Sequence, residues 1–369
     1  MAAITFGASV SLSGRYALQG RQALAGMLAW AAATNEAGGM RRGQGKAQVR
    51  LCYYDDNSEA TLAARNTERL VQRDRVQVLL GPYSSELMLA AASVAARSGR
   101  VIWNHGGASD AVHKRGARVV GVSTPASRYF SGFPSLALRI NPGGRSIVCL
   151  HRAGSGFGRR AAQGALVAAR QLGMDVAVRA YRSLEDAPEV VKGLGGVDYV
   201  LAAGSFQEDV RLGQELLRRG LPVVACGLVA AAITEFACAV GDGSEGFLAP
   251  SQWEPSLRPQ PDFGPQPSEV ATRVGVDYPA AQAYAACLLA QHCLERAGGW
   301  EDDALWRTAC RLDCTTFFGR FRIDPRNGLQ VGHQMVWVQW QKGNKAIVWP
   351  PQYAQADPLP LRQVGQEVD

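Results

Sequence analysis

The stretch "VQVLLGPYSSELMLAAASVAARSGRVIWNHGGASD", residues 76–110, sets the pattern of the fold. It combines an apolar strand, an alanine-rich helix that ends at glycine, a second apolar strand and a glycine-rich loop. Ser84 and Ser85 stand at the start of the helix, and Gly106 and Ala108 follow the second strand. Small hydroxyls and bare backbone suit a pocket for a small ligand better than they suit a core.

The same alternation continues along the whole chain. Apolar strands are predicted within residues 3–12, 47–56, 145–151, 175–182, 197–204 and 222–227. Helices are predicted within residues 22–39, 58–74 (N-cap Asn57 or Ser58), 128–140, 158–173, 205–220, 278–299 and 301–313. Six prolines within 250–268 indicate a crossover loop, and residues 333–350 alternate across Gly343–Asn344 as a β-hairpin does. The pattern predicts two doubly wound α/β units with parallel sheets.

The bulk properties fit a folded globular protein. A chain of 369 residues, 47% hydrophobic and 19% charged, suits two domains of middling size. No apolar run is long enough to span a membrane. The start, "MAAITFGASVSLSG", has no basic leader and enters a strand at once, so we expect no signal peptide in this sequence. The net charge of +7 comes from scattered arginines, which does not predict nucleic-acid binding.

Eight cysteines are spread over the chain without the spacing of a dense disulfide framework. Cys52, Cys149 and Cys226 lie in apolar strand-like runs and are interpreted as small buried hydrophobes. A disulfide between the helix at 278–299 and the helix at 301–313 is left as a possibility. "CRLDC" (310–314) has no CxxC or HxxxH partner, so we expect no metal site.

In open parallel sheets, ligands bind beyond the carboxyl ends of the strands. Ser84 and Ser85 stand at the N-cap and first position of a helix, where a hydroxyl and free N–H groups can hold a carboxylate; a plain helix cap is the alternative. Gly106 and Ala108 follow the next strand, where the alternative is a flexible turn. Adjacent strands bring the two loops together, which favours a site, and His105 lies beside it.

The second unit has equivalent positions. Phe157 lies in "CLHRAGSGFGRR" (149–160), Ser205 follows the next strand together with Phe206, and Leu228 follows the strand after that. The glycines of "GSGFGRR" depart from the dinucleotide fingerprint, because Arg159 stands where the third glycine belongs. We also find no nucleophile with a base and no pair of catalytic carboxylates. The sequence therefore predicts neither a catalytic residue nor a cofactor.

Three stretches resemble a known family: "SLSGRYALQGRQALAGMLAWAAATNEAGG", "YYDDNSEATLAARNTERLVQRDRVQVLLGPYSS" and "STPASRYF". They are similar to the ABC-transporter substrate-binding proteins of the branched-chain amino acid type, which are type I periplasmic binding proteins. The resemblance covers about residues 4–350. It implies two lobes, joined by three crossover segments, that close around a ligand. Lobe 1 would be residues 1–123 and 252–330, and lobe 2 residues 124–251 and 331–369.

The resemblance also implies contacts for the ligand. Ser85 matches the serine that meets the ligand carboxylate, and Gly106 and Ala108 match a loop that supplies backbone contacts, although the family often has threonine where Ala108 stands. Gln19 matches a cleft residue on the first loop, and Phe157 and Phe206 match aromatic positions. The candidate ligand residues further include Tyr16, Ser84, His105 and Ser205.

The family's amino-acid binders have an acidic residue near position 228 that pairs with the ligand ammonium, and this chain has Leu228. A buried ammonium without a partner is unfavourable by several kcal/mol or more. We therefore expect a carboxylate on an apolar or aromatic body, packed by Phe157, Phe206, Trp103 and Trp253. A core position is the alternative for each of these rings, and for Trp103 it is the slightly favoured one.

These expectations define a solute-binding receptor of an ABC importer that is not an enzyme. The resemblance implies a periplasmic or lipid-anchored extracytoplasmic location, a membrane permease as partner and a monomeric protein. A cytosolic ligand-sensing regulator of the same fold is the alternative, favoured by the lack of a signal peptide and by the eight cysteines. An enzyme that uses a nucleotide is a third class, which the failed fingerprint argues against.

Overall fold

The computed structural model describes residues 3–114 and 116–361, and the chain divides into two compact units. Each unit combines two separate segments, so the chain passes from one unit to the other three times. Unit 1 contains Met1–Pro125 and Trp253–Gln334, and unit 2 contains Ala126–Gln252 and Met335–Asp369.

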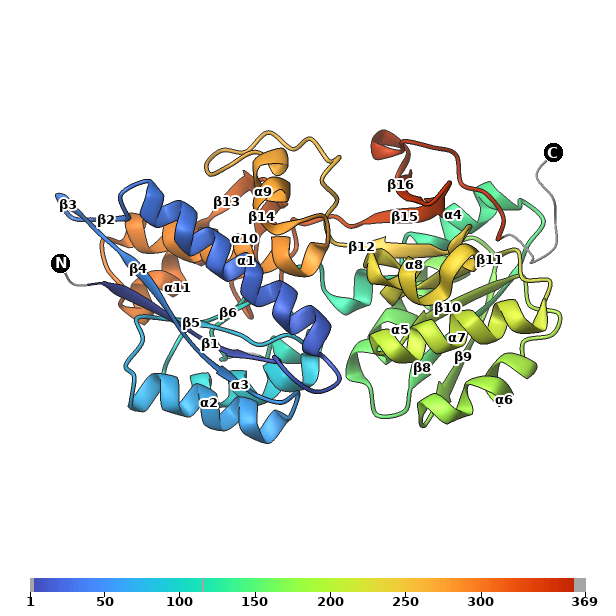
Figure 1. Ribbon diagram of the computed structural model, residues 1–369, viewed down its shortest axis with the longest axis horizontal. Helices are drawn as coiled ribbons and strands as arrows, with labels where there is room; N and C mark the ends of the chain where they lie inside the picture. Colours follow the sequence, from blue (N-terminus) through green and yellow to red (C-terminus); the bar gives the residue numbers. More distant parts are fainter. Residues whose placement is uncertain (1–2, 115, 362–369) are drawn as a thin grey trace. The chain divides into compact units, whose positions relative to one another are not determined.

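Unit 1 has a five-stranded sheet in which all strands are parallel (Figure 1). The strand order is β4 (Val49–Asp55), β1 (Ile4–Val10), β5 (Val78–Leu80), β6 (Ile102–Asn104) and β7 (Val119–Gly121). The parallel α/β sheet predicted from the alternation is confirmed. Two short antiparallel pairs were not predicted: β2 (Met40–Arg42) with β3 (Gly45–Ala47), and β13 (Asp313–Thr316) with β14 (Gly319–Arg322).

Helices cover both faces of this sheet. α2 (Ala60–Gln72) and α3 (Ser85–Arg97) pack together over a core that includes Leu70, Met88 and Ile102. The other helices are α1 (Ala17–Glu36), α9 (Pro267–Val274), α10 (Tyr278–Ala297) and α11 (Asp302–Arg311). α1 and α10 approach so closely that a Cβ added at Gly26 would lie 2.0 Å from the Ala280 carbonyl oxygen. Only glycine permits this contact.

Unit 2 has a seven-stranded sheet of mixed direction. The strand order is β16 (Asn344–Trp349), β15 (Val336–Gln341), β12 (Leu248–Ser251), β11 (Ala225–Leu228), β10 (Tyr199–Ala203), β8 (Ser146–Arg152) and β9 (Asp175–Tyr181). The strands from β9 to β12 are parallel, and β15 and β16 form the predicted antiparallel hairpin. The hairpin turn is Lys342–Gly343, one residue earlier than expected, because these two residues have φ of 53° and 74°.

The helices of unit 2 are α4 (Phe133–Ile140), α5 (Gly156–Gln171), α6 (Ala187–Lys192), α7 (Phe206–Arg219) and α8 (Glu235–Val240). Successive residues of β11 point to opposite faces of the sheet. A Cβ at Gly227 would contact Leu201 and Trp337 at 2.7 and 3.0 Å. Leu228 instead lies against Gly213 of α7. This alternation fixes which side of the sheet each candidate side chain occupies.

Some local expectations are corrected by the structure. The N-cap of α2 is Glu59, because Asn57 and Ser58 adopt left-handed φ of 50° and 59° and form the turn before it. All eight cysteines are free, so the bridge left open between α10 and α11 does not form. Cys149 and Cys226 are fully buried as predicted, and burial raises the pKa of the Cys149 thiol to about 12.

Candidate functional site

Hydrogen bonds join the loops that follow two neighbouring strands of unit 1, β5 and β6. Beyond the carboxyl ends of β5 and β6, Tyr83 forms an isolated bridge with Gly106, and the Ser84 N–H donates to the Gly106 carbonyl at 3.3 Å. The Ser85 hydroxyl accepts the Ser109 N–H at 2.9 Å. Together with the loop after β1, these segments are called the unit 1 edge loops: residues 11–16, 81–84 and 105–109.

The two serines at the start of α3 have different roles. Ser84 is the N-cap: its backbone has a φ of 88° and its hydroxyl accepts the Leu87 N–H at 3.3 Å. Ser85 is the first helical residue and is half-buried. A hydroxyl that accepts one hydrogen bond still has its own hydrogen to donate. This holds for both serines, but Ser84 is buried, so Ser85 is the one whose O–H can be offered to a carboxylate.

Packing explains the glycines of the edge loops. A Cβ at Gly106 would lie 2.7 Å from the Tyr83 Cα, and one at Gly107 would lie 2.5 Å from the Met88 Cβ. The Gly107 N–H already donates to the Asn104 side-chain oxygen at 2.7 Å. The two glycines are therefore not evidence of a ligand by themselves, because packing within unit 1 already requires a residue without a side chain at both positions. Ala108 lies between them and Ser109 and is half-buried.

Tyr16 and Arg15 belong to the same group of side chains. The Tyr16 ring meets the Tyr83 ring edge-on, with centroids 6.3 Å apart, and the Arg15 guanidinium lies 4.6 Å from the Tyr16 centroid. Arg15 also forms an ion pair with Glu86 in the first turn of α3. Gln19 is 5% exposed, and its side-chain oxygen has no hydrogen-bond partner among the described residues. Tyr83 and Arg15 were not among the predicted site residues, although "GPYSS" and "SGRY" flank those that were.

His105 and the two tryptophans lie in the interior of unit 1. His105 is 1% exposed, and burial lowers its pKa to about 4, so it is neutral near pH 7. Trp103 in β6 is equally buried, and Trp253 is completely buried, with its indole N–H donating to the Phe317 carbonyl at 3.1 Å. The core interpretation of Trp103 and Trp253 is the one that this burial favours.

The corresponding loops of unit 2 follow β8, β10 and β11 and are called the unit 2 edge loops: residues 153–155, 204–205 and 229–230. Phe157, in the first turn of α5, is half-buried and meets the Tyr129 ring edge-on at 4.9 Å. The Tyr129 hydroxyl accepts a hydrogen bond from the Gln252 amide at 2.9 Å. Ser155 caps α5 by accepting the Gly158 N–H at 3.0 Å. Phe157 thus keeps an exposed part beside an anchored aromatic neighbour.

Ser205 and Phe206 begin α7, and Leu228 ends β11. Ser205 is the N-cap, and its N–H donates to Glu208 at 2.7 Å in a capping box. Phe206 is half-buried. Leu228, the last residue of β11, is completely buried against α7, which favours a core position for it.

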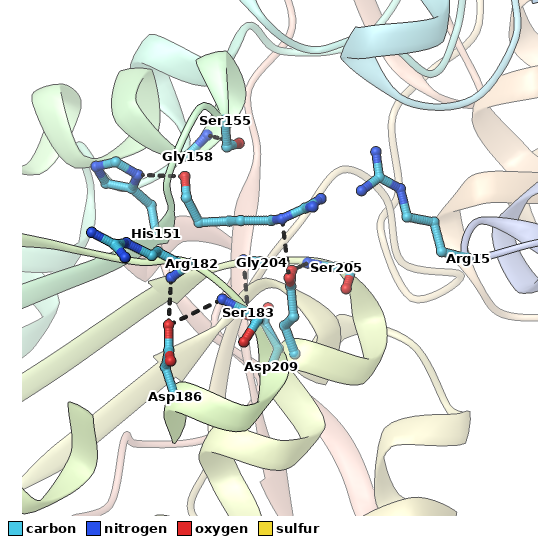
Figure 2. A network of polar contacts seen from close by, with 12 residues as sticks. Arg15, His151, Ser155, Gly158, Arg182, Ser183, Asp186, Gly204, Ser205 and Asp209 are labelled. Atoms are coloured by element: carbon cyan, nitrogen blue, oxygen red, sulfur yellow. Dashed lines mark hydrogen bonds and ion pairs between the residues drawn. The ribbon is translucent and has the colours of Figure 1, made fainter. Parts of the chain in front are cut away.

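The sequence analysis missed a carboxylate that ties the unit 2 edge loops together. Asp209 of α7 is completely buried and accepts the Gly204 N–H at 2.8 Å, as Figure 2 shows. It also accepts the Ala230 N–H at 3.0 Å. Its neighbour Glu208 pairs with Arg152, at the end of β8, at 3.5 Å. "SFQEDV" gives the only sequence signal, since two acidic residues in the first turn of a helix are common surface features.

Burial dominates the electrostatics of this group. It raises the pKa of Asp209 from 3.8 to about 7, against the opposing effect of the backbone N–H groups. The Tyr181 hydroxyl is buried without a hydrogen-bond partner among the described residues, and burial together with Asp209 and Glu208 raises its pKa well above its ordinary value. A Cβ at Gly204 would lie 2.4 Å from that hydroxyl.

These features describe binding surfaces. Among residues 3–114 and 116–361, no group of three or more His, Cys, Asp or Glu side chains is arranged to hold a metal ion. Within the same residues, no helix is both long and apolar enough to cross a membrane. What the edge loops offer is hydroxyls, arginines and aromatic rings at the carboxyl ends of parallel strands, where α/β proteins bind small molecules.

Parallel α/β units with such loops define a class of small-molecule-binding proteins, and the comparison with known families agrees. The model of the family described as "Periplasmic binding protein" matches residues 3–345. The chain therefore belongs to the periplasmic binding protein family, as the resemblance implied.

Solved structures share this fold at low sequence identity. The leucine binding protein LivK of Thermotoga maritima is 17% identical, with a TM-score of 0.81 over 94% of this chain and 97% of that chain. A solute binding protein of R. palustris in complex with benzoate is 16% identical, with a TM-score of 0.76 over 94% and 96%. LivJ of Streptococcus pneumoniae in complex with isoleucine is 18% identical, with a TM-score of 0.77 over 95% and 100%.

Proposed function

We propose that the protein is the solute-binding receptor of an ABC importer and that its ligand is a small acid with an aromatic or branched apolar body. The receptor is not an enzyme, acts outside the cytoplasm and delivers its ligand to a membrane permease. The residues proposed to contact the ligand are Ser85, which donates to the carboxylate, and Phe157 and Phe206, which pack the body.

One observation carries the choice of an acid over an amino acid. The carboxylates on or beside the edge loops already have partners: Glu86 pairs with Arg15, Glu208 with Arg152, and Asp209 accepts two backbone N–H groups. An ammonium group would have to share one of these carboxylates with the partner it already has. Each guanidinium has five N–H donors, so Arg15 and Arg152, whose side chains are 32% and 40% exposed, keep N–H groups for a ligand carboxylate besides those paired with Glu86 and Glu208.

The solved relatives support both halves of this proposal. The fold accommodates an amino acid in LivJ, which was solved with isoleucine, and aromatic acids in R. palustris proteins solved with benzoate and 4-hydroxybenzoate. An aromatic acid therefore requires no change of architecture. The lobe boundaries predicted from the sequence remain part of the proposal, with the three crossings acting as hinges when the ligand is trapped.

The decisive experiment compares ligands that differ only in the ammonium group. Leucine is paired with 4-methylpentanoate, and phenylalanine with 3-phenylpropanoate, together with benzoate and 4-hydroxybenzoate. We expect the acids to raise the melting temperature of ligand-free protein and the amino acids to have little effect. At a hundredfold excess over Kd, binding adds about 2.7 kcal/mol to the free energy of unfolding, which a thermal shift detects easily.

The opposite result has a clear meaning. If leucine stabilises the protein more than 4-methylpentanoate does, an ammonium partner exists and the choice of an acid is wrong. If none of the acids or amino acids binds in calorimetry, the receptor takes another class of ligand.

The free cysteines favour a second candidate, a cytosolic ligand-sensing regulator of the same fold. All eight thiols are unpaired, which suits a reducing compartment. Fractionation of cells that produce the protein from its full natural gene separates the two candidates. Recovery with the periplasm or the membrane supports the receptor, and recovery with the cytosol supports the sensor.

A further inference from the structure

A basic hollow on unit 1 lies apart from the edge loops. It has a cavity volume of about 410 Å³ and is formed by the last turn of α10, by α11 and by the start of β13. Its lining residues are Arg296, Ala304, Arg307, Thr308, Arg311, Leu312 and Asp313. A volume of this size lies in the range of small-molecule sites, about 300–1,000 Å³.

The hollow is remote from the edge loops within unit 1. The start of α11 is fixed at the amino-terminal ends of β6 and β7, because Asp302 pairs with Arg100 at 2.8 Å and Asp303 pairs with Arg118. Asp302 also accepts the Val101 N–H, which leads into β6. The candidate ligand residues, in contrast, follow the carboxyl ends of the strands.

Three arginines converge on this hollow without an acidic partner. Arg307 and Arg311 are four residues apart on α11 and share one helix face, where like charges destabilise the helix. Arg296 approaches from the last turn of α10. Among the described residues, none of the three forms an ion pair, and all three are exposed.

The carboxylates near the hollow are engaged by other arginines. Asp313 lines it but accepts two hydrogen bonds from Arg320, both at 2.8 Å, and these bonds lower the pKa of Asp313. Glu295, next to Arg296, pairs with Arg41 at 3.3 Å. These two carboxylates are therefore paired with other arginines and do not balance the positive charge of the three arginines at the hollow.

The shape of the donors indicates the ligand. A guanidinium presents its N–H groups in a planar fork that matches two oxygens of a phosphate or carboxylate. The Thr308 hydroxyl donates to the Ala304 carbonyl at 2.8 Å, and Arg296 contacts the His292 ring nitrogen at 3.3 Å. The donors left for a ligand are thus mainly guanidinium groups, which favour a multiply charged oxyanion over a neutral polar molecule.

We propose that this hollow is a second binding site of the protein, which takes the phosphoryl group of a small phosphate-bearing molecule or inorganic phosphate. The anion is held by Arg296, Arg307 and Arg311 and relieves their mutual repulsion. Binding at this site is independent of the acid ligand proposed for the edge loops.

The test uses calorimetry and thermal shifts on the full chain at low ionic strength. The probes are inorganic phosphate, pyrophosphate and glycerol 3-phosphate, each compared with sodium chloride at equal ionic strength. The variant is Arg307→Gln with Arg311→Gln. Its charge-matched control is Arg65→Gln with Arg97→Gln, two exposed arginines on α2 and α3 of the same unit.

We expect phosphate probes to bind the wild type and the control alike, and to bind the Arg307/Arg311 variant at least tenfold more weakly. Tighter binding of glycerol 3-phosphate than of inorganic phosphate identifies a phosphate ester as the occupant, and the reverse identifies inorganic phosphate. Equal binding to both double variants, or no difference from chloride, overturns the proposal. The acid ligand of the edge loops should bind all three proteins equally, so failure of one site does not imply failure of the other.

Discussion

The edge loops of unit 1 and unit 2 follow the carboxyl ends of parallel strands, but they are held together by different means. In unit 1, backbone contacts and a serine hydroxyl join the loops after β5 and β6, and glycines allow the close approach. In unit 2, a buried carboxylate from α7 joins two loops, because Asp209 accepts N–H groups from both. The contact between the loops after β5 and β6 is thus made by neutral groups, although the buried Asp56 holds the neighbouring loop after β1 by accepting the Ser11 hydroxyl at 2.6 Å.

This difference has consequences for how each edge responds to change. Neutral hydrogen bonds do not depend on pH near neutrality, while a buried carboxyl group links its loops to proton binding. Steric substitutions should therefore disturb the contact between the loops after β5 and β6 most, and pH should act on the unit 2 edge through Asp209. The following predictions test this contrast.

The largest expected effect is on the pH dependence of stability. Burial raises the folded-state pKa of Asp209 from 3.8 to about 7, so the folded protein keeps a proton that the unfolded chain loses near pH 4. The free energy of unfolding should fall, relative to Asp209→Asn, by up to about 1.4 kcal/mol per pH unit as the pH rises from about 4 to about 7. Urea unfolding at several pH values measures this.

The matched control for that experiment is Asp186→Asn. Asp186 also accepts two backbone N–H groups, from Arg182 at 2.7 Å and Ser183 at 3.1 Å, but it is half-exposed. Any change that Asp186→Asn shares with Asp209→Asn is then due to the lost hydrogen bonds to backbone N–H groups. If the free energies of unfolding of Asp209→Asn and the wild type change in parallel with pH, Asp209 does not make the stability of unit 2 depend on pH.

The next largest effect is steric. Gly107→Ala should destabilise unit 1 by about 1–3 kcal/mol, since its Cβ would overlap Met88 at 2.5 Å in a filled core. Gly154→Ala in the unit 2 edge loops is the contrast, because no atom lies within 4 Å of its Cβ and only its φ of 80° opposes the change. Chemical denaturation compares them, and equal losses would show that packing does not distinguish the two edges.

Ser85→Ala should weaken binding of the acid ligand by about 1–3 kcal/mol, because a charged acceptor would lose its donor. The control is Ser93→Ala on the same helix, whose hydroxyl donates to the Leu89 carbonyl on the exposed side. Calorimetry with the best acid from the screen measures both. Unchanged affinity in Ser85→Ala would remove the hydroxyl from the site.

The smallest effect concerns the aromatic neighbours of unit 2. Phe157→Leu should lower the free energy of unfolding by about 0.5–1.5 kcal/mol, the usual worth of an edge-on ring pair such as the one with Tyr129 at 4.9 Å. Phe206→Leu, at the equivalent place on α7, has no ring partner among the described residues and should change stability less. A larger loss of stability in Phe206→Leu than in Phe157→Leu would show that the ring pair with Tyr129 is not the more important contact.

Local rules predicted most elements but erred where distant segments intervene. Hydrophobic periodicity identified the core strands and long helices, and the preference for serine at a helix N-cap identified the start of α3. The start of α1 was predicted five residues late, because Tyr16 is held there by the Ser58 hydroxyl, which accepts the Tyr16 N–H at 3.0 Å. The short strand β7 was missed because three apolar residues give too little pattern to recognise.

The candidate site was predicted in part for the same reason. Ser84, Ser85 and Gly106 follow directly from strand ends, and the structure brings them together. The burial of Leu228 was not predicted, because a shift of one position along a strand turns a side chain from one face of the sheet to the other. Asp209 was missed because an acidic residue in a first helical turn is normally solvated, and its bond from the Ala230 N–H joins residues far apart in the chain.

From the sequence alone followed the parallel α/β class and the chemical character of the loops, because these depend on short-range periodicity and on residue type. The family resemblance also came from the sequence, through three stretches that are similar to known members. Only the tertiary structure decided which side chains are buried, which carboxylate titrates near neutrality and which arginines lack a partner. Those properties depend on contacts between residues far apart in the chain, and burial then changes the free energy of charged groups by amounts that local sequence does not encode.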